Sequence, residues 1–261
     1  MGQRNSTKTR VVPVFDKLLS NDSTGKAWLP RLLSLPGAWR PSHEDKESAF
    51  VIQEHKWGAP EQALKPPLAL LAWLIRNPRA PISGVLSRDA DKAKIRQEWI
   101  NGSDARISEA LSLLSHNPNN LDWHIFEGAT YPDVYIKTEK FLVVIEGKRT
   151  ESDVTTTTKW MPCRHQMLRH LDCAWEVKGN REVLGFFIVE SHVGASVPPD
   201  WCARASRTTN FDVVRSSLPH RSPEEQWAIA RSFIGITTWQ EICHEFTDLG
   251  LCAEALPDTV T

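Results

Sequence analysis

The residues whose types could support chemistry stand at the two ends of a predicted β-hairpin. Asp133 opens an alternating run that ends near Lys137. Residues 141–145 form a continuous apolar run that leads directly into Glu146. An alternating run and an apolar run separated by a few polar residues predict two antiparallel strands.

The register of this hairpin follows from its turn. With the turn centred on Glu139 and Lys140, Asp133 falls opposite Glu146 and on the same side of the sheet. The two-residue period of a strand adds Lys148 to that side. We therefore expect two carboxylates and one ammonium group to converge at the rim of a buried sheet, where they could hold a divalent cation and a phosphate.

These residue types match the needs of phosphodiester hydrolysis. The reaction requires a more nucleophilic water, charge relief on the phosphate oxygens and a stabilised leaving alkoxide, and Mg²⁺ supplies these when oxygen ligands leave positions open for water and phosphate. Asp133, Glu146 and the backbone carbonyl of Gly147 are the predicted metal ligands, and the missing side chain of Gly147 would permit a close approach. Lys148 is expected to contact the scissile phosphate and to orient or help deprotonate the water, because a neighbouring metal disfavours its ammonium form.

Pro132-Asp133 followed by Glu146-Gly147-Lys148 resembles the PD-(D/E)XK nuclease superfamily, which has a restriction-endonuclease-like fold. The resemblance covers residues 91–190 and implies an αβββαβ core, in which helices flank a mixed central sheet. It also implies Mg²⁺-dependent cleavage of nucleic acid, usually DNA, with Mn²⁺ as an alternative ion. Carried over by residue, Asp133 and Glu146 match the metal ligands of the family and Lys148 matches its catalytic lysine. The competing interpretation is an edge hairpin with solvated charges.

A helical segment and a strand are predicted before the hairpin. Apolar residues recur at helical spacing over residues 90–115, with a break at residues 101–103. A short strand is predicted over residues 123–127. Because family members often add an acid from the first core helix, Glu109, on the polar side of the second helical segment, is the candidate third metal ligand.

Two other glutamates, Glu98 and Glu127, compete with Glu109 for this role. For each of the three, a solvated position at a helix or strand end is as good an interpretation as a ligand.

The segment after the hairpin predicts a helix over residues 159–177 and a buried strand over residues 183–190. The helix would follow the second hairpin strand immediately and could face the substrate. Gln166 and Arg164 match, in type and location, residues that some family members carry on this helix, and Gln166 is therefore a candidate catalytic residue.

Three arginines near the predicted site are candidate contacts to nucleic acid: Arg149, Arg164 and Arg169. A solvated basic surface is the competing interpretation for each of them.

The remaining sequence predicts the domain organisation. Residues 1–60 are punctuated by proline and are expected to form an irregular extension packed on the core, followed by a nuclease domain over residues 61–250 and a tail over residues 251–261. Within this domain, residues 223–249 predict two C-terminal helices, which begin at Ser222-Pro223 and near Thr237-Thr238.

Charge and cysteine content limit the classes of protein. A formal net charge of −1 over 261 residues argues against a protein that coats DNA, but a nuclease with its own metal ions needs no basic chain. Five cysteines without a closely spaced pair favour a reducing cytoplasm. No segment is apolar over a length that would span a membrane, so no membrane partner is expected.

The sequence therefore predicts a cytoplasmic, Mg²⁺-dependent deoxyribonuclease, and more specifically an endonuclease of restriction, defence or repair. The sequence leaves two kinds of assembly open: a homodimer, or a complex with a separate protein that recognises the target. The alternatives are a subunit that binds nucleic acid without cutting it and an RNA-cleaving relative with the same site.

Overall fold

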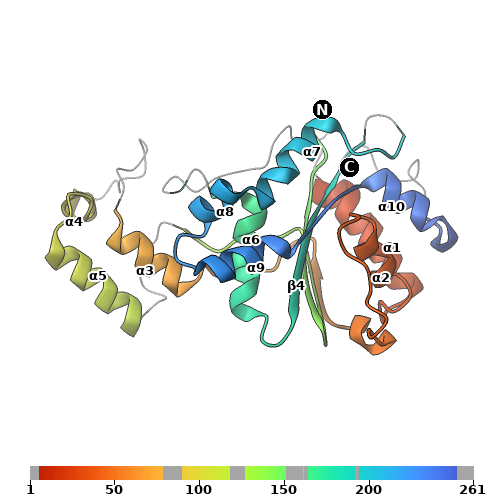
Figure 1. Ribbon diagram of the computed structural model, residues 1–261, viewed down its shortest axis with the longest axis horizontal. Helices are drawn as coiled ribbons and strands as arrows, with labels where there is room; N and C mark the ends of the chain where they lie inside the picture. The colour runs from red at the N-terminus through yellow and green to blue at the C-terminus, as the bar shows by residue number, and fades with distance from the viewer. Residues whose placement is uncertain are drawn as a thin grey trace.

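The computed structural model describes residues 6–78, 90–117, 127–150, 161, 164–191 and 194–251. Within them a five-stranded sheet runs through the centre of the molecule (Figure 1). In spatial order its strands are β1 (Ile52–Trp57), β2 (Val134–Thr138), β3 (Phe141–Gly147), β4 (Glu182–Val189) and β5 (Phe233–Thr238). The first three strands pair antiparallel and the last three pair parallel. The prediction of an α/β chain with a mixed central sheet is therefore confirmed.

Helices cover both faces of this sheet (Figure 1). One face carries α1 (Val12–Asn21), α2 (Leu29–Ser34) and α10 (Trp239–Glu245). The other face carries α6 (Gln166–Val177), α7 (Pro199–Ser206), α8 (Phe211–Ser217) and α9 (Pro223–Arg231). On β3, Val143 and Ile145 join the first layer, whereas Leu142 and Val144 join the second. This two-sided burial explains why β3 has a continuous apolar sequence.

The strand that pairs with the outer side of β2 is not the one that the sequence predicted. The strand expected over residues 123–127 lies mostly outside the described residues, and Glu127 is not part of a strand. The neighbour of β2 is β1, which pairs Trp57 with Val134. β1 is an edge strand with several exposed polar side chains, so its sequence lacks the apolar alternation that predicts a strand.

The N-terminal segment is more regular than predicted. Instead of an irregular extension, it contains a π-helical turn, η1 (Thr7–Val11), the helices α1 and α2, a short turn η2 (Glu47–Phe50), and the strand β1. Pro13 and Pro30 lie in the first turns of α1 and α2, where a missing N–H breaks no helical hydrogen bond. These prolines begin helices, whereas the sequence analysis took them for breaks.

Three helices form an insertion between β1 and β2: α3 (Leu68–Arg76), α4 (Ala90–Ile100) and α5 (Asp104–His116). The predicted break at residues 101–103 is confirmed, and Gly102 there has a φ of +80°. α3 and α5 share a small apolar cluster that includes Leu74 and Ala110. Backbone hydrogen bonds between Leu64 and Thr130 connect the two ends of the insertion. The insertion extends away from the sheet (Figure 1), so α4 and α5 are not the core helix that the sequence predicted.

Two elements that follow β3 agree with the prediction in kind but not at every boundary. β4 corresponds to the strand predicted over residues 183–190. α6 begins at Gln166, because His165 before it has an extended backbone, and the predicted start at residue 159 lies outside the described residues.

The C-terminal helices begin where the sequence predicted. Ser222 and Glu225 form a capping box at the start of α9, and the Thr238 side chain accepts a hydrogen bond from the backbone N–H of Glu241 in α10. β5, between these helices, was not predicted. Two short turns complete this region, η3 (Arg207–Thr209) and η4 (Thr247–Leu249). The predicted tail lies almost entirely outside the described residues. In the described part of the chain, no helix combines the length and the apolar character that crossing a membrane requires.

Candidate active site

The hairpin β2–β3 brings the two predicted carboxylates together. Val134 pairs with Ile145, so Asp133 and Glu146 occupy the next facing positions, as the turn at residues 139–140 predicted. Val144, two residues before Glu146 in β3, packs in the α6 layer, so the Glu146 side chain points to the same side. Asp133 faces Glu146 across the hairpin and therefore lies on that side as well. Asp133 is 8% exposed and Glu146 is 5% exposed. Two carboxylates are thus buried side by side at the end of the sheet.

Lys148 and Gln166 also meet at this point. Lys148 Nζ lies 2.8 Å from Glu146 Oε1, and Gln166 Nε2 donates a hydrogen bond of 2.7 Å to the same oxygen. Gln166 reaches Glu146 because it is the first residue of α6, which packs on β3. Four of the predicted site residues therefore converge, and we call them, together with His170, the acidic site.

His170 is a residue of this site that the sequence analysis did not select. Its Nε2 lies 3.0 Å from Glu146 Oε2, and its Nδ1 lies 2.8 Å from Thr130 Oγ1. It follows Gln166 by one turn of α6 and so lies on the same helix face. The four-residue spacing between Gln166 and His170 was the sequence signal that could have identified it.

Asp133 is held by donors from two other segments. Its Oδ2 accepts a hydrogen bond of 2.8 Å from the Gly147 backbone N–H, and its Oδ1 accepts one of 3.0 Å from Thr7 Oγ1. Burial, and then repulsion from Glu146, raise the pKa of Asp133 to about 8. The pKa of Glu146 is lowered: burial acts to raise it, but the His170 hydrogen bond and the Lys148 charge outweigh that effect. Of the two carboxyl groups, Asp133 is therefore the one whose ionised form the protein does not stabilise.

Glu61 is a further carboxyl near the acidic site. Burial, and then the charge of Glu146, raise its pKa, and His170 acts to lower it. Glu61 precedes the bridge residue Leu64 at the start of the insertion. Nothing in the spacing of Glu61 from the hairpin could have identified it.

The predicted third acid, Glu109, lies elsewhere. Its side chain is 45% exposed and pairs with Arg106 at 2.8 Å on the surface of α5. Glu98 pairs with the same arginine at 2.7 Å. Glu109 was selected on the assumption that its helix packs in the core. Because that helix belongs to the insertion, Glu109 is a surface residue and the prediction is corrected.

Gly147 has a packing role that the sequence analysis did not foresee. A Cβ atom on Gly147 would lie 2.8 Å from Trp239 Cζ2 and 3.1 Å from Val11 Cγ2. These atoms belong to the opposite layer from the acidic site. The missing side chain therefore leaves room for the Trp239 indole, while the carbonyl of Gly147 stays a candidate ligand.

The three arginines predicted to contact nucleic acid are engaged within the protein. Arg164 is only 1% exposed and therefore cannot reach a nucleic acid, so that prediction is corrected. Arg149 is buried and donates to Thr9 Oγ1 at 3.0 Å. Arg169 donates to Glu127 Oε1 at 3.2 Å and to the Gly128 carbonyl at 2.9 Å.

Arg164 belongs to a second buried group of charges, which we call the arginine cluster. Its members are Glu127, Arg164, Asp172, His220 and Arg221. Arg164 lies 2.7 Å from both Glu127 and Asp172, and Arg221 lies 2.9 Å from Asp172. His220 Nε2 lies 3.3 Å from Asp172 Oδ2. Although burial acts to raise it, the pKa of Asp172 is held below its usual value by the nearby His220 and by the charges of Arg164 and Arg221.

The acidic site does not form a closed metal cage. In the part of the chain that the structure describes, no group of three or more Asp, Glu, His or Cys side chains is arranged to hold a metal ion. Asp133 and Glu146 form a facing pair of carboxylates, and any further ligands would have to be backbone carbonyls, water or substrate oxygens.

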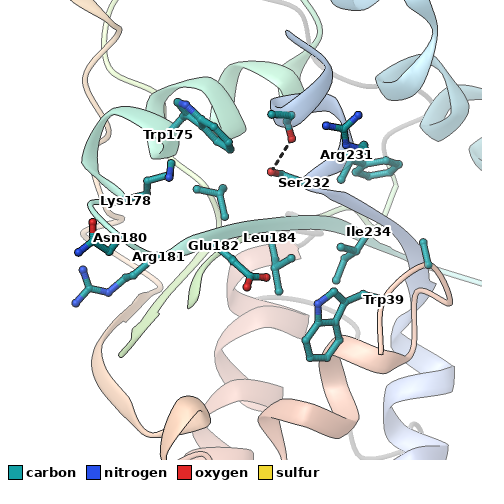
Figure 2. A pocket seen from close by; sticks show the side chains of 14 residues that line it. Trp39, Trp175, Lys178, Asn180, Arg181, Glu182, Leu184, Arg231, Ser232 and Ile234 are labelled. Carbon is teal, nitrogen blue, oxygen red and sulfur yellow. Dashed lines mark hydrogen bonds between the residues drawn. The ribbon is translucent and has the colours of Figure 1, made fainter. Parts of the chain in front are cut away.

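A cavity of about 450 Å³ lies near the other end of β4 (Figure 2). Its walls include Trp39, Trp175, Lys178, Leu184, Arg231 and Ile234. Lys178 and Arg231 stand at the C-terminal ends of α6 and α9, where a cation interacts favourably with helix-end carbonyls. The one carboxylate in its wall, Glu182, lies 3.4 Å from Lys140. This cavity has no pair of carboxylates, so we place the candidate chemistry at the acidic site.

Known proteins do not add to this assignment. No family model, no curated protein and no solved structure to which the chain was compared matches it. The functional argument therefore rests on the geometry of the described residues.

Proposed function

We propose that this chain is a metal-dependent nuclease that hydrolyses phosphodiester bonds in DNA. The observation that carries the proposal is the convergence of Asp133, Glu146 and Lys148 at the end of the hairpin, with Gln166 joined to Glu146. Two buried carboxyl groups lie beside one lysine, and a buried acid whose pKa is strongly raised, as that of Asp133 is, favours a functional role.

The arrangement of elements supports a restriction-endonuclease-like core. When α2, η2 and the insertion are set aside, the chain runs α1, β1, β2, β3, α6 and β4, which is the αβββαβ order that the resemblance implies. β1, β2 and β3 form an antiparallel meander, and β4 is parallel to β3 after the α6 crossover. The α3–α5 insertion interrupts this order between β1 and β2.

The donor set of the acidic site fits Mg²⁺, with Mn²⁺ as an alternative. Proteins commonly bind Mg²⁺ through one or two carboxylates and leave the remaining positions to water and substrate phosphate. Asp133 and Glu146 would hold the ion together with the Gly147 carbonyl. The raised pKa of Asp133 supports this assignment, because burial and repulsion from Glu146 disfavour its ionised form, which a bound cation would stabilise. When bound, the ion would supply Lewis-acid polarisation of the phosphate and a more acidic water.

The side chains around the carboxylates have distinct roles in the proposed reaction. Lys148 is buried and adjacent to Glu146, so its ammonium group would contact a phosphate oxygen and orient the attacking water. Gln166 holds Glu146 Oε1 from the helix side. Thr7 and the Gly147 N–H hold the two oxygens of Asp133. The carboxylates are thus oriented by donors from three segments of the chain, η1, the end of β3 and α6, a preorganised arrangement that favours catalysis.

The wider context is proposed from the resemblance alone. An endonuclease in restriction, defence or repair fits the chemistry, and so does a cytoplasmic location for a chain whose described cysteines Cys173, Cys202 and Cys243 are free thiols. A homodimer or a target-recognising partner would supply a second cut or sequence selection.

A plasmid assay tests the proposal. The purified protein is incubated with supercoiled DNA in Mg²⁺, in Mn²⁺ and in chelator, beside Asp133→Asn and Lys148→Ala. Glu109→Gln serves as the matched control, because it removes an acid from the exposed surface of the insertion. We expect metal-dependent nicking by the wild type and by Glu109→Gln only.

The same assay separates the alternatives. A wild-type protein that shifts DNA on a gel but leaves it intact would favour a binding subunit. Cleavage of RNA but not of DNA in a parallel reaction would change the proposed substrate.

A further inference from the structure

A chain of two hydrogen bonds leads from Thr130 to Glu146 through His170. Thr130 Oγ1 lies 2.8 Å from His170 Nδ1, and His170 Nε2 lies 3.0 Å from Glu146 Oε2. Thr130 is 3% exposed and His170 is 1% exposed. The three side chains form a buried line that ends on one of the two proposed metal ligands.

The chemistry of the groups sets the direction of these bonds. An ionised carboxylate can only accept, so His170 Nε2 must carry the hydrogen that it donates to Glu146. In a neutral imidazole, Nδ1 then accepts the hydroxyl hydrogen of Thr130. The Thr130 hydroxyl therefore favours one tautomer and one ring orientation of His170.

The fold holds both Thr130 and His170 in place. The backbone of Thr130 exchanges hydrogen bonds of 2.8 and 2.9 Å with Leu64 at the base of the insertion. His170 lies within α6, one turn after Gln166. Glu146 therefore accepts hydrogen bonds on Oε1 from Lys148 and Gln166 and on Oε2 from His170.

We propose that Thr130 and His170 are positioning residues that fix the orientation of Glu146 for the nuclease reaction. This inference rests on the proposed function and adds two residues to it. A buried histidine that only filled the core could satisfy its nitrogens with nearby backbone groups. This one joins a reactive carboxylate to a side chain on a separate segment, and outer partners of this kind typically change metal affinity or activity by about 10- to 100-fold when removed.

Thr130→Val is the first test, because it removes the hydroxyl and keeps the side-chain shape. We expect kcat to fall by about 10-fold and the Mg²⁺ concentration for half-maximal rate to rise, whereas the Kd for DNA in chelator stays unchanged. Thr208→Val is the matched control. Thr208 is equally buried, and its hydroxyl has no hydrogen-bond partner among the described residues.

Substitutions of His170 extend the test. We expect His170→Leu to lower kcat by about 100-fold and His170→Gln, whose amide can still donate to Glu146, to recover part of that loss. The double variant Thr130→Val/His170→Leu should be no slower than His170→Leu, because Thr130 acts only through His170.

Nitrogen-15 NMR of the histidine ring gives a readout that does not depend on cleavage. We expect the wild type to show the Nε2–H tautomer of His170, with an Nδ1 shift that changes in Thr130→Val and not in Thr208→Val. An Nδ1–H tautomer, or equal kcat for wild type and Thr130→Val, would overturn the positioning role alone. If the wild type cuts no DNA, the proposed function itself fails.

Discussion

α6 carries part of two buried groups of charges, and their electrostatics differ. In the arginine cluster, the carboxylates of Glu127 and Asp172 lie against Arg164, and Asp172 also lies against Arg221. In the acidic site, Asp133 and Glu146 face each other, and Lys148 is paired with Glu146. The two groups are similarly buried, so burial alone does not separate a structural site from a functional one.

The pKa values of the two aspartates follow from this difference. The nearby His220, Arg164 and Arg221 hold the pKa of Asp172 below its usual value, whereas burial and a neighbouring carboxylate raise the pKa of Asp133 to about 8. A buried carboxylate that is paired with cations contributes to stability only while those cations remain, because removing one member of the group leaves an unpaired charge in the interior. An uncompensated carboxylate lowers stability and is therefore a candidate for function.

The largest effect on stability is expected at the arginine cluster. Asp172→Asn leaves Arg164 and Arg221 without their shared carboxylate, and the free energy of unfolding should fall by about 3–5 kcal/mol, as when one partner of a buried ion pair is removed. Urea unfolding measures this change. The exposed Asp200→Asn is the control and should change stability by no more than about 0.5 kcal/mol. Equal effects of the two substitutions would mean that the cluster does not stabilise the fold.

The opposite pattern is expected at the acidic site. Asp133→Asn should lower the rate of DNA cleavage by at least about 100-fold, equivalent to about 2.7 kcal/mol of activation free energy. In chelator the same variant should be as stable as the wild type or more stable, because an amide carries no charge and does not have to be kept protonated against burial and the repulsion from Glu146. Cleavage kinetics and urea unfolding on one preparation test both statements. An active variant, or one that unfolds like Asp172→Asn, contradicts the comparison.

The pH dependence of stability should have opposite signs in the two groups. The pKa of Asp133 is raised on folding, so its contribution is fully present below about pH 4 and is lost as the pH rises to about 8. The pKa of Asp172 is lowered, so its contribution is present above about pH 4 and is lost as the pH falls below that value.

The stability difference between Asp133→Asn and the wild type should therefore grow with pH, by at most about 1.4 kcal/mol per pH unit, and level off above pH 8. Unfolding titrations in chelator between about pH 5 and pH 9 would reveal it. A difference that stays constant over this range would show that Asp133 is ionised throughout.

A smaller effect is expected at Gly147, which borders the acidic site but packs against the other layer. Gly147→Ala places a methyl group 2.8 Å from Trp239 and should lower the free energy of unfolding by about 1–3 kcal/mol. Gly128→Ala, where no atom lies within 4 Å of the added carbon, is the control. Thermal unfolding of both variants measures the difference. No loss in Gly147→Ala would indicate that the Trp239 ring moves freely.

The hairpin was predictable because its signals are local. A two-residue period, an apolar run and a turn at residues 139–140 fix the register of Asp133 and Glu146 without any long-range information. The break before α5 was predictable for the same reason, since Gly102 adopts a left-handed conformation there.

Long-range placement was not predictable. Which strand lies beside β2 depends on tertiary pairing, and the polar edge strand β1 carries no clear period. Glu109 and Arg164 had suitable residue types and predicted helical positions. In the structure, Glu109 pairs with Arg106 on the surface, and Arg164 pairs with Asp172 in the interior, before α6 begins. The Thr130 hydroxyl and the His170 imidazole come from two segments that are 40 residues apart in the sequence, and only the folded structure shows that they lie together beside Glu146.

The central claim is that Asp133 and Glu146 hold a divalent cation. Isothermal titration calorimetry of Mn²⁺ into the wild type, Asp133→Asn and Glu109→Gln, each with a short phosphorothioate DNA duplex, tests it most directly. We predict saturable binding by the wild type and by Glu109→Gln, and at least about 10-fold weaker binding by Asp133→Asn. Equal binding by wild type and Asp133→Asn, or no binding by the wild type, would contradict the account.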